Sequence, residues 1–197
     1  MKIGLIVVLV LLASLVLFGG CGVSAYNGLV SKDENATARW TEIQNQYQRR
    51  ADLVPQLVET VKGASNFERG TLEAVTEARA SVGRVQLPDT TSPEQMKAYF
   101  QAQDGLSGAL QRLLVVSENY PELRSVGNFQ DLQAQLEGTE NRLAVARNRF
   151  IEATRDYNVA IRRFPASVLA GMFGFQPKAQ LEVPAGSTER PTIDFGK

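Results

Sequence analysis

The sequence predicts an all-α protein: an antiparallel bundle of three to four long helices, preceded by an N-terminal membrane segment. Three observations support this fold class. Residues 3–23 form an uncharged apolar stretch, and apolar residues then recur every three to four positions over most of residues 26–164. That region contains no useful stretch in which polar and apolar residues alternate, as they would in a half-buried strand.

These patterns divide the chain into three parts. We expect a membrane anchor or lipoprotein-type signal at residues 1–23 and a helical body at residues 24–175. Residues 176–197 contain three prolines among polar residues, so we expect an extended, largely disordered tail.

Composition argues against several classes of function. The 197 residues include 21 lysines and arginines, 21 aspartates and glutamates, no histidine and one cysteine. The zero net charge argues against a nucleic-acid-binding domain, which needs a basic excess. Catalytic pairs that use histidine, cysteine-rich metal sites and an intrachain disulfide all lack their residues. No pair of carboxylates stands out as a catalytic pair, so we expect no catalysis, no cofactor and no metal.

The apolar stretch at residues 3–23 is long enough to cross a membrane. As a helix it spans roughly 31 Å, about the thickness of a hydrocarbon core. A retained anchor would keep Lys2 in the cytoplasm and place the body outside. A lipoprotein signal would instead be cleaved before Cys21, which follows Gly19 and Gly20 and would carry the lipid. Simple secretion is a third alternative. The first two both tether the body outside the cytoplasmic membrane.

Two helices are predicted in the first part of the body. In the first, the apolar stripe keeps its phase through Pro55, where we expect a kink. Gly63 ends this helix, and Ser65 or Asn66 would cap the second. The stripe of the first helix consists of Trp40, Ile43, Tyr47, Val54, Leu57 and Val61, and that of the second of Leu72, Val75, Ala78 or Arg79, Val82 and Val85.

Two longer helices follow the loop at residues 86–95. The loop ends in a predicted capping box, with Ser92 as the cap and Gln95 as its partner. The last helix runs from residue 128 to Phe164 and would be roughly 55 Å long. Residues 165–175 are apolar and are predicted to form a short helix that folds back onto the bundle. A second membrane contact is the alternative, although these residues are too few to span a membrane. The stripes consist of Met96, Tyr99, Gln103, Leu106, Leu110, Leu113 and Ser117, and then of Phe129, Leu132, Leu136, Thr139, Leu143, Ala146, Phe150, Ala153, Tyr157, Ala160 and Phe164.

A group of sequence segments is spread over the chain after the anchor. The segments are YNGLV at 26–30, QNQYQRRADLVPQLVETVKG at 44–63, EARA at 77–80, YPEL at 120–123, TENR at 139–142 and PTIDF at 191–195. Together they resemble the LemA family of bacterial envelope proteins, and the resemblance covers nearly all of the chain after the anchor. Cys21, just before the first segment, departs from the commonest family pattern. The resemblance implies a single N-terminal membrane segment and a long-helix bundle outside the cytoplasm, without an established enzymatic activity.

One charged residue interrupts the apolar stripe of the first helix. Arg50 stands where a buried charge would need a partner. Glu140 on the last helix adjoins the stripe position Thr139 and is the candidate partner, with Glu137 as the other nearby carboxylate. A buried pair of Arg50 and Glu140 would set the helix register, or it would form a polar notch that binds a ligand.

The exposed side of the first helix supplies the candidate partner-binding surface. Arg49 and Asp52 are three residues apart and can pair on one face of the helix, with Gln56 beyond them. The alternative is that these residues are only a solvated helix surface. A helical face of this kind can bind a partner through a ridge of side chains.

The sequence favours a membrane-tethered interaction or scaffold protein of the bacterial envelope, without catalysis. The expected partners are membrane lipid and another envelope protein. An accessory role in envelope signalling or stress sensing is the alternative, and an enzyme that works with carboxylates alone is less favoured. The sequence predicts no nucleic-acid partner, and it does not specify an oligomeric state.

Overall fold

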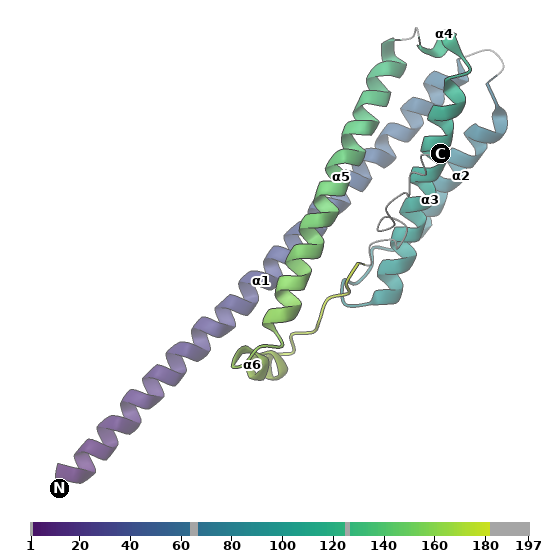
Figure 1. Ribbon diagram of the computed structural model, residues 1–197. Helices are drawn as coiled ribbons and strands as arrows, with labels where there is room; N and C mark the ends of the chain where they lie inside the picture. The colour runs from purple at the N-terminus through teal and green to yellow at the C-terminus, as the bar shows by residue number, and fades with distance from the viewer. Residues whose placement is uncertain (1, 64–66, 125–126, 182–197) are drawn as a thin grey trace, which may run out of the picture.

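The computed structural model describes residues 2–63, 67–124 and 127–181. All regular structure in these ranges is helical, which confirms the predicted fold class. The long helices are α1 (Lys2–Lys62), α2 (Arg69–Arg84), α3 (Pro93–Ser117) and α5 (Gly127–Ala160), and the short ones are α4 (Pro121–Arg124) and α6 (Ala166–Phe173). The four long helices run alternately in opposite directions and form an antiparallel bundle (Figure 1).

The bundle consists of two closely packed antiparallel pairs, α1 with α5 and α2 with α3. On α5, Ala146 and Ala153 are buried, and their small side chains allow α1 to approach closely. Larger side chains fill the space between the two pairs. The Trp40 ring on α1 lies 5.5 Å from the Tyr99 ring on α3 and 5.5 Å from the Phe150 ring on α5, measured between centroids.

Helical periodicity predicted most of the core correctly. All predicted stripe residues of the first helix and of α3 are buried, and so are those of α5 up to Tyr157. The predicted stripe of α2 is less buried. Only Val75 in it lies fully inside, because α2 packs mainly against α3 and leaves its remaining sides to solvent.

The predicted end of the last long helix differs from the structure. α5 ends at Ala160 rather than at Phe164, and Phe164 is 84% exposed just before a cis peptide bond to Pro165. The chain turns there, so Ile161 takes the buried position instead. α6 then folds back onto α1, as predicted, and ends at Gly174, whose φ of 74° is in the left-handed region that favours glycine.

The predicted start signals are only partly present. Ser65 and Asn66 lie outside the described residues, and α2 begins at Arg69, after Glu68. At the start of α3, the Ser92 hydroxyl accepts a hydrogen bond from the backbone N–H of Gln95 at 3.4 Å. The capping box is not completed, because the Gln95 side chain accepts from the backbone N–H of Asp89 at 2.9 Å instead of from Ser92.

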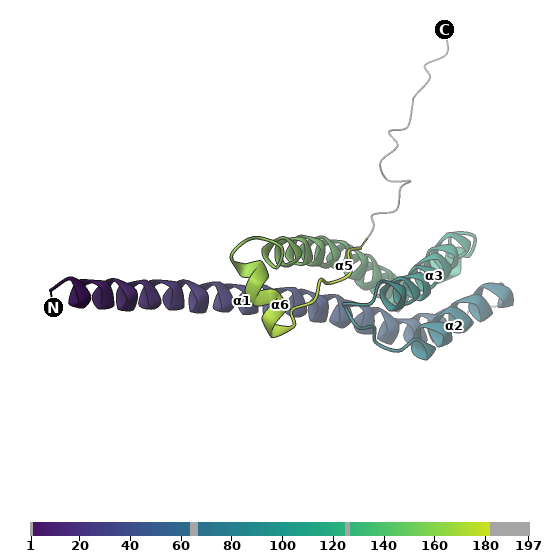
Figure 2. The ribbon, with the colours of Figure 1, turned by 90° about the horizontal axis from the view of Figure 1, so that it is seen from below.

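α1 is one uninterrupted helix from the apolar stretch into the body. It continues through Pro55 without a break and through the predicted boundary after residue 23. Its first half projects from the bundle, as both ribbon views show (Figures 1 and 2). No linker therefore separates the apolar segment from the packed helices.

Residues 176–181 are extended and cross the end of the bundle. Asn158 on α5 bonds to them twice: its amide group donates to the carbonyl of Lys178 at 2.8 Å, and its side-chain oxygen accepts from the N–H of Lys178 at 2.9 Å. The ammonium of Lys178 lies 2.9 Å from the Asp33 carboxylate on α1. The sequence predicted an extended, largely disordered tail here and did not predict this packing. Residues 182–197 lie outside the described residues.

Candidate functional site

Arg50 is fully buried at the centre of the bundle. Its guanidinium donates to a carboxylate oxygen of Glu140 at 3.1 Å and to the hydroxyl of Ser107. It also donates to the backbone carbonyl of Gln103 at 3.0 Å and to the side-chain oxygen of the same residue. The guanidinium carbon lies 4.9 Å from the centre of the Tyr47 ring. The contact predicted between Arg50 and Glu140 is therefore present, together with polar partners that the sequence did not indicate. The pair is not buried as a whole, because the Glu140 side chain is 39% exposed.

The Arg50 cluster, formed by Arg50, Gln103, Ser107 and Glu140, joins three helices. Arg50 comes from α1, Gln103 and Ser107 from α3, and Glu140 from α5. A buried arginine is costly unless its donors are satisfied in good geometry, so these partners fix how the two helix pairs sit against each other. The Nε atom of Arg50 is buried and has no hydrogen-bond partner among the described residues.

A second polar group lies beside this cluster. Arg147 on α5 donates through Nε to the Tyr47 hydroxyl at 2.9 Å, and its Nη2 donates to the same hydroxyl and to Asp104 on α3 at 2.8 Å. Burial raises the pKa of Tyr47 to about 12, and the nearby Arg147 only partly offsets this effect. The Tyr47 hydroxyl is therefore neutral near pH 7 and does not act as a base there.

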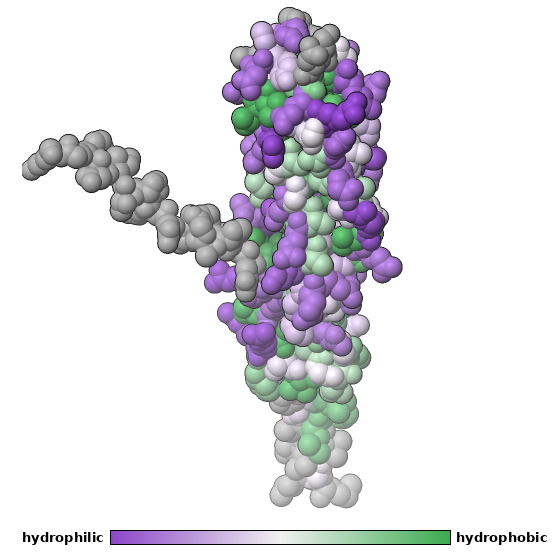
Figure 3. Space-filling view, turned by 90° about the vertical axis from the view of Figure 1, so that its right-hand side faces the viewer, coloured by the Kyte–Doolittle hydropathy of each residue, from purple (hydrophilic) through white to green (hydrophobic). Residues whose placement is uncertain are grey.

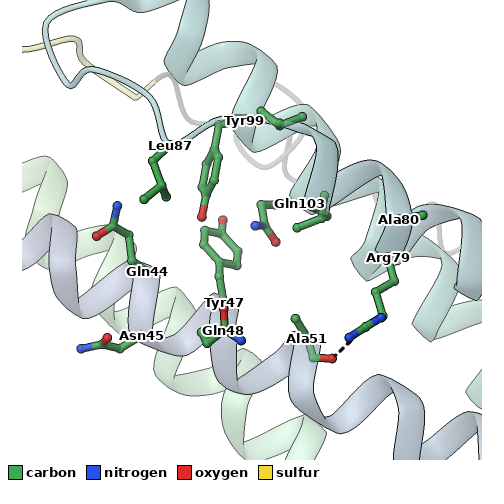
Figure 4. Close-up of a pocket in the computed structure, with 13 residues that line it drawn as sticks. Gln44, Asn45, Tyr47, Gln48, Ala51, Arg79, Ala80, Leu87, Tyr99 and Gln103 are labelled. Carbon is green, nitrogen blue, oxygen red and sulfur yellow. Dashed lines mark hydrogen bonds between the residues drawn. The ribbon is translucent and has the colours of Figure 1, made fainter.

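A groove of about 600 Å³ lies next to both groups, between α1 and the α2–α3 pair. In Figure 4 the hydroxyl ends of Tyr47 and Tyr99 point toward each other, and Gln103 lies beside them. Arg79 on α2 closes one end by donating to the carbonyl of Ala51 at 3.3 Å. The groove is lined by Gln44, Asn45, Tyr47, Gln48, Ala51, Arg79, Ala80, Val82, Gly83, Val85, Leu87, Tyr99 and Gln103.

The chemistry of this groove is that of hydrogen bonding. Apart from Arg79, its lining side chains are neutral, and burial raises the pKa of Tyr99 as it does that of Tyr47. Such a surface offers amide and hydroxyl groups to a ligand, and it supplies no group poised to exchange a proton near pH 7. Among the described residues, no group of three histidine, cysteine, aspartate or glutamate side chains is arranged to hold a metal ion.

The predicted partner-binding surface lies on the exposed side of α1. Arg49, Asp52 and Gln56 are all exposed. Within the described residues, the predicted pair of Arg49 and Asp52 is not formed. Asp52 instead accepts a hydrogen bond at 2.8 Å from the side chain of Gln48, which lies four residues earlier on the same face. Gln48 also lines the groove, so this surface and the groove adjoin.

Cys21 is exposed and lies in the projecting half of α1. The helix passes through it without interruption. Leu15, Val16 and Val23 on either side of it are also exposed, so this part of α1 makes little contact with the body.

Sequence reasoning missed most of the polar partners. Gln103 stood on the predicted stripe of α3, and a polar residue at an apolar position was a usable signal. Ser107, Asp104 and Arg147 gave no comparable signal, because each lies beside a stripe, where polar residues are ordinary. Only the packing of the three helices brings them to Arg50 and Tyr47.

Comparison with known proteins identifies the family. A model of the LemA family matches residues 39–195 of the chain. Magnetosome protein MamQ of Magnetospirillum gryphiswaldense is 28% identical over 195 residues, which cover 89% of this chain and 71% of the relative. Magnetosome proteins MamQ 2 and MamQ 1 of Paramagnetospirillum magneticum are each 28% identical over 183 residues, covering 83% of this chain and 67% of each relative. Since the family model spans well over half of the sequence, the chain belongs to the LemA family.

Proposed function

We propose that this protein is a membrane-tethered, extracytoplasmic interaction module that holds a rigid helical body at the membrane and presents it to another envelope protein, without catalysis. The observation that carries this proposal is the continuity of α1. One helix is long and apolar enough to cross a membrane by length and composition, and it is the same helix that forms the core of the body. Any partner bound to the body is thereby held at a fixed height above the bilayer.

The buried polar groups support a structural role rather than a reactive one. The bonds of Arg50 to Gln103, Ser107 and Glu140 use its two terminal nitrogens. Tyr47 holds its proton to about pH 12. These groups connect helices, and we propose that they keep the body rigid.

The exposed side of α1 is the proposed contact surface. Arg49, Asp52 and Gln56 lie on it, next to the groove that Gln48 borders. The surface combines a cation, a carboxylate and amides, and the groove beside it has a volume of about 600 Å³, enough for a side chain from a partner. Binding energy concentrates where a side chain enters such a hollow.

The test is photo-crosslinking in intact cells with a benzophenone amino acid at position 49 or 56 of the full-length chain. We expect both positions to give an adduct with the same envelope protein, identified by mass spectrometry. The double variant Arg49→Glu with Gln56→Glu, assayed by pull-down, should lower capture of that protein by about tenfold.

A matched control has the same change in charge at other exposed positions. The double variant Arg155→Glu with Gln101→Glu should leave capture unchanged, since both residues are exposed on α5 and α3. Equal loss in both double variants would point to charge alone, and unchanged capture in the first would remove this surface. If no position yields an adduct, the interaction module itself loses its support.

The two tethering routes differ at Cys21. Fatty-acid labelling of the wild type that disappears in Cys21→Ser would identify a lipoprotein. An unlabelled chain whose N-terminal segment is intact by mass would identify a retained anchor. Recovery of the full-length protein in the soluble fraction after an alkaline wash would contradict both.

A further inference from the structure

An exposed hydrophobic face lies at the end of the body where α5 turns into α6. Phe164 is 84% exposed, Val168 54%, Met172 74% and Phe173 58%. Val168 and Met172 are four residues apart and share one side of α6. Large apolar side chains gathered in this way on a protein surface mark an interaction site.

This face is fixed beside α1 just where the apolar stretch ends. The Tyr26 ring on α1 lies 4.8 Å from the Phe173 ring and 5.8 Å from the Phe175 ring, measured between centroids. Leu29 on α1 is buried together with Ala170 of α6. Tyr26 is three residues beyond Val23, the last residue of the apolar stretch, so the two are separated by about 4.5 Å along the helix axis.

The hydrophobic character of this face continues toward the apolar half of α1. Figure 3 shows hydrophobic residues at the narrowing lower end of the molecule and hydrophilic residues over the body above. Figures 1 and 2 both place α6 at that end, against α1. Arg162 and Arg163 are exposed immediately before Phe164, at a position suited to lipid phosphates.

We propose that α6 and Phe164 insert into the interfacial layer of the same bilayer that α1 crosses, as a second and shallow membrane contact. The inference rests on the proposed function, because it requires α1 to be the span. α6 has only eight residues, so it lies in the interface rather than crossing it. Apolar side chains of such a helix enter the boundary between headgroups and acyl chains by roughly 5–10 Å, and aromatic rings favour the same layer.

Depth-dependent fluorescence quenching tests this contact. The full-length chain with Cys21→Ser receives one new cysteine, labelled with an environment-sensitive dye, and is reconstituted in mixed phosphatidylcholine and phosphatidylglycerol vesicles. With Met172→Cys or Val168→Cys we expect a blue-shifted emission and quenching by nitroxide lipids labelled near the headgroup. That quenching should exceed by about twofold or more the quenching at Gln101→Cys, an exposed position on α3 in the body.

A label at Val16→Cys separates the two hypotheses. Strong quenching there by nitroxides deep in the acyl region, with no quenching at positions 168 and 172, would overturn the interfacial contact and leave the anchor in place. An unquenched label at position 16 would overturn the anchor and the inference together. A blue shift at positions 168 and 172 without lipid quenching would mean that protein, not lipid, covers the face, and would also overturn the proposal.

Discussion

The two halves of α1 share one helical backbone and differ in how their apolar residues are distributed around it. In the first half apolar residues face all directions, and Leu15 is 72% exposed. In the second half they follow one stripe, and Ile43 is fully buried. A helix satisfies its own backbone hydrogen bonds, so it can continue from lipid into a protein core without a break. The angular distribution of side chains, not the secondary structure, decides which surroundings each half requires.

The most direct test of this difference places an aspartate in each half of α1. Ile43→Asp buries an unpaired carboxylate between α1 and its neighbours, and we expect it to destabilise the body by about 3–5 kcal/mol. Urea unfolding of residues 24–181, followed by circular dichroism, measures this loss.

Leu15→Asp is the matched change in the first half. In the full-length chain, solubilised in detergent, it should leave the urea unfolding of the body unchanged. In cells it should weaken membrane insertion by about 3 kcal/mol, seen as full-length chain released from the membrane fraction. If Leu15→Asp destabilised the body as Ile43→Asp does, the projecting half of α1 would be part of the fold.

The second prediction concerns Arg50, the fully buried charged residue in the packed half of α1. Arg50→Ala leaves Gln103 and Glu140 without their cation and opens a cavity, so we expect a loss of about 3–4 kcal/mol. Arg50→Met fills most of the space without a charge, and its cost should be clearly smaller. The same urea titration compares the two variants. Equal costs would show that packing, rather than the polar partners, determines the stability contributed by this position.

The third prediction concerns residues 176–181, which pack near the boundary between the two halves of α1. The segment at residues 176–181 ties Asn158 to Asp33, close to the start of the packed half of α1. A body that ends at residue 175 loses four hydrogen bonds and a half-buried ion pair. The bonds are the two with Asn158, one from the Tyr157 hydroxyl to the carbonyl of Gln176 and one from the N–H of Ala179 to the carbonyl of Thr90. This body should be about 2–5 kcal/mol less stable than one that ends at 181. Lys178→Met within the longer form should lose only the ion-pair part. Identical stability of all three forms would show that the body ends at residue 175.

The smallest expected effect is a dependence on pH. The folded state holds the Tyr47 proton to about pH 12, whereas an ordinary tyrosine loses it near pH 10. Between these values the unfolded state binds fewer protons, so stability falls as the pH rises. Tyr47→Phe should cost about 1 kcal/mol at pH 7, through the lost hydrogen bond with Arg147, and should make the decline above pH 10 shallower. Part of the slope should remain, because burial also raises the pKa of Tyr157 to about 12.

Sequence periodicity predicted the regularly spaced core residues of the helices and missed the contacts that follow no repeat. The stripes of α3 and α5 follow from spacing alone, and Arg50 was recognisable because it interrupts a stripe. The end of α5 was misplaced because the apolar spacing continues to Phe164 although the helix stops at Ala160. The packing of residues 176–181 depends on Asn158, a contact between distant parts of the chain that composition cannot indicate. Arg147 was missed because only the assembled bundle brings it to Tyr47.

Because α1 is uninterrupted, the position of the body relative to the apolar half of the helix depends on helical phase as well as on length. One residue inserted between Val23 and Tyr26 would lift the body by about 1.5 Å and turn it by about 100° around the helix axis. Seven inserted residues would lift it by about 10 Å and turn it back to within about 20° of its first orientation. The direction in which Arg49 and its neighbours face, relative to the apolar half of α1, therefore depends on the number of residues between the two halves.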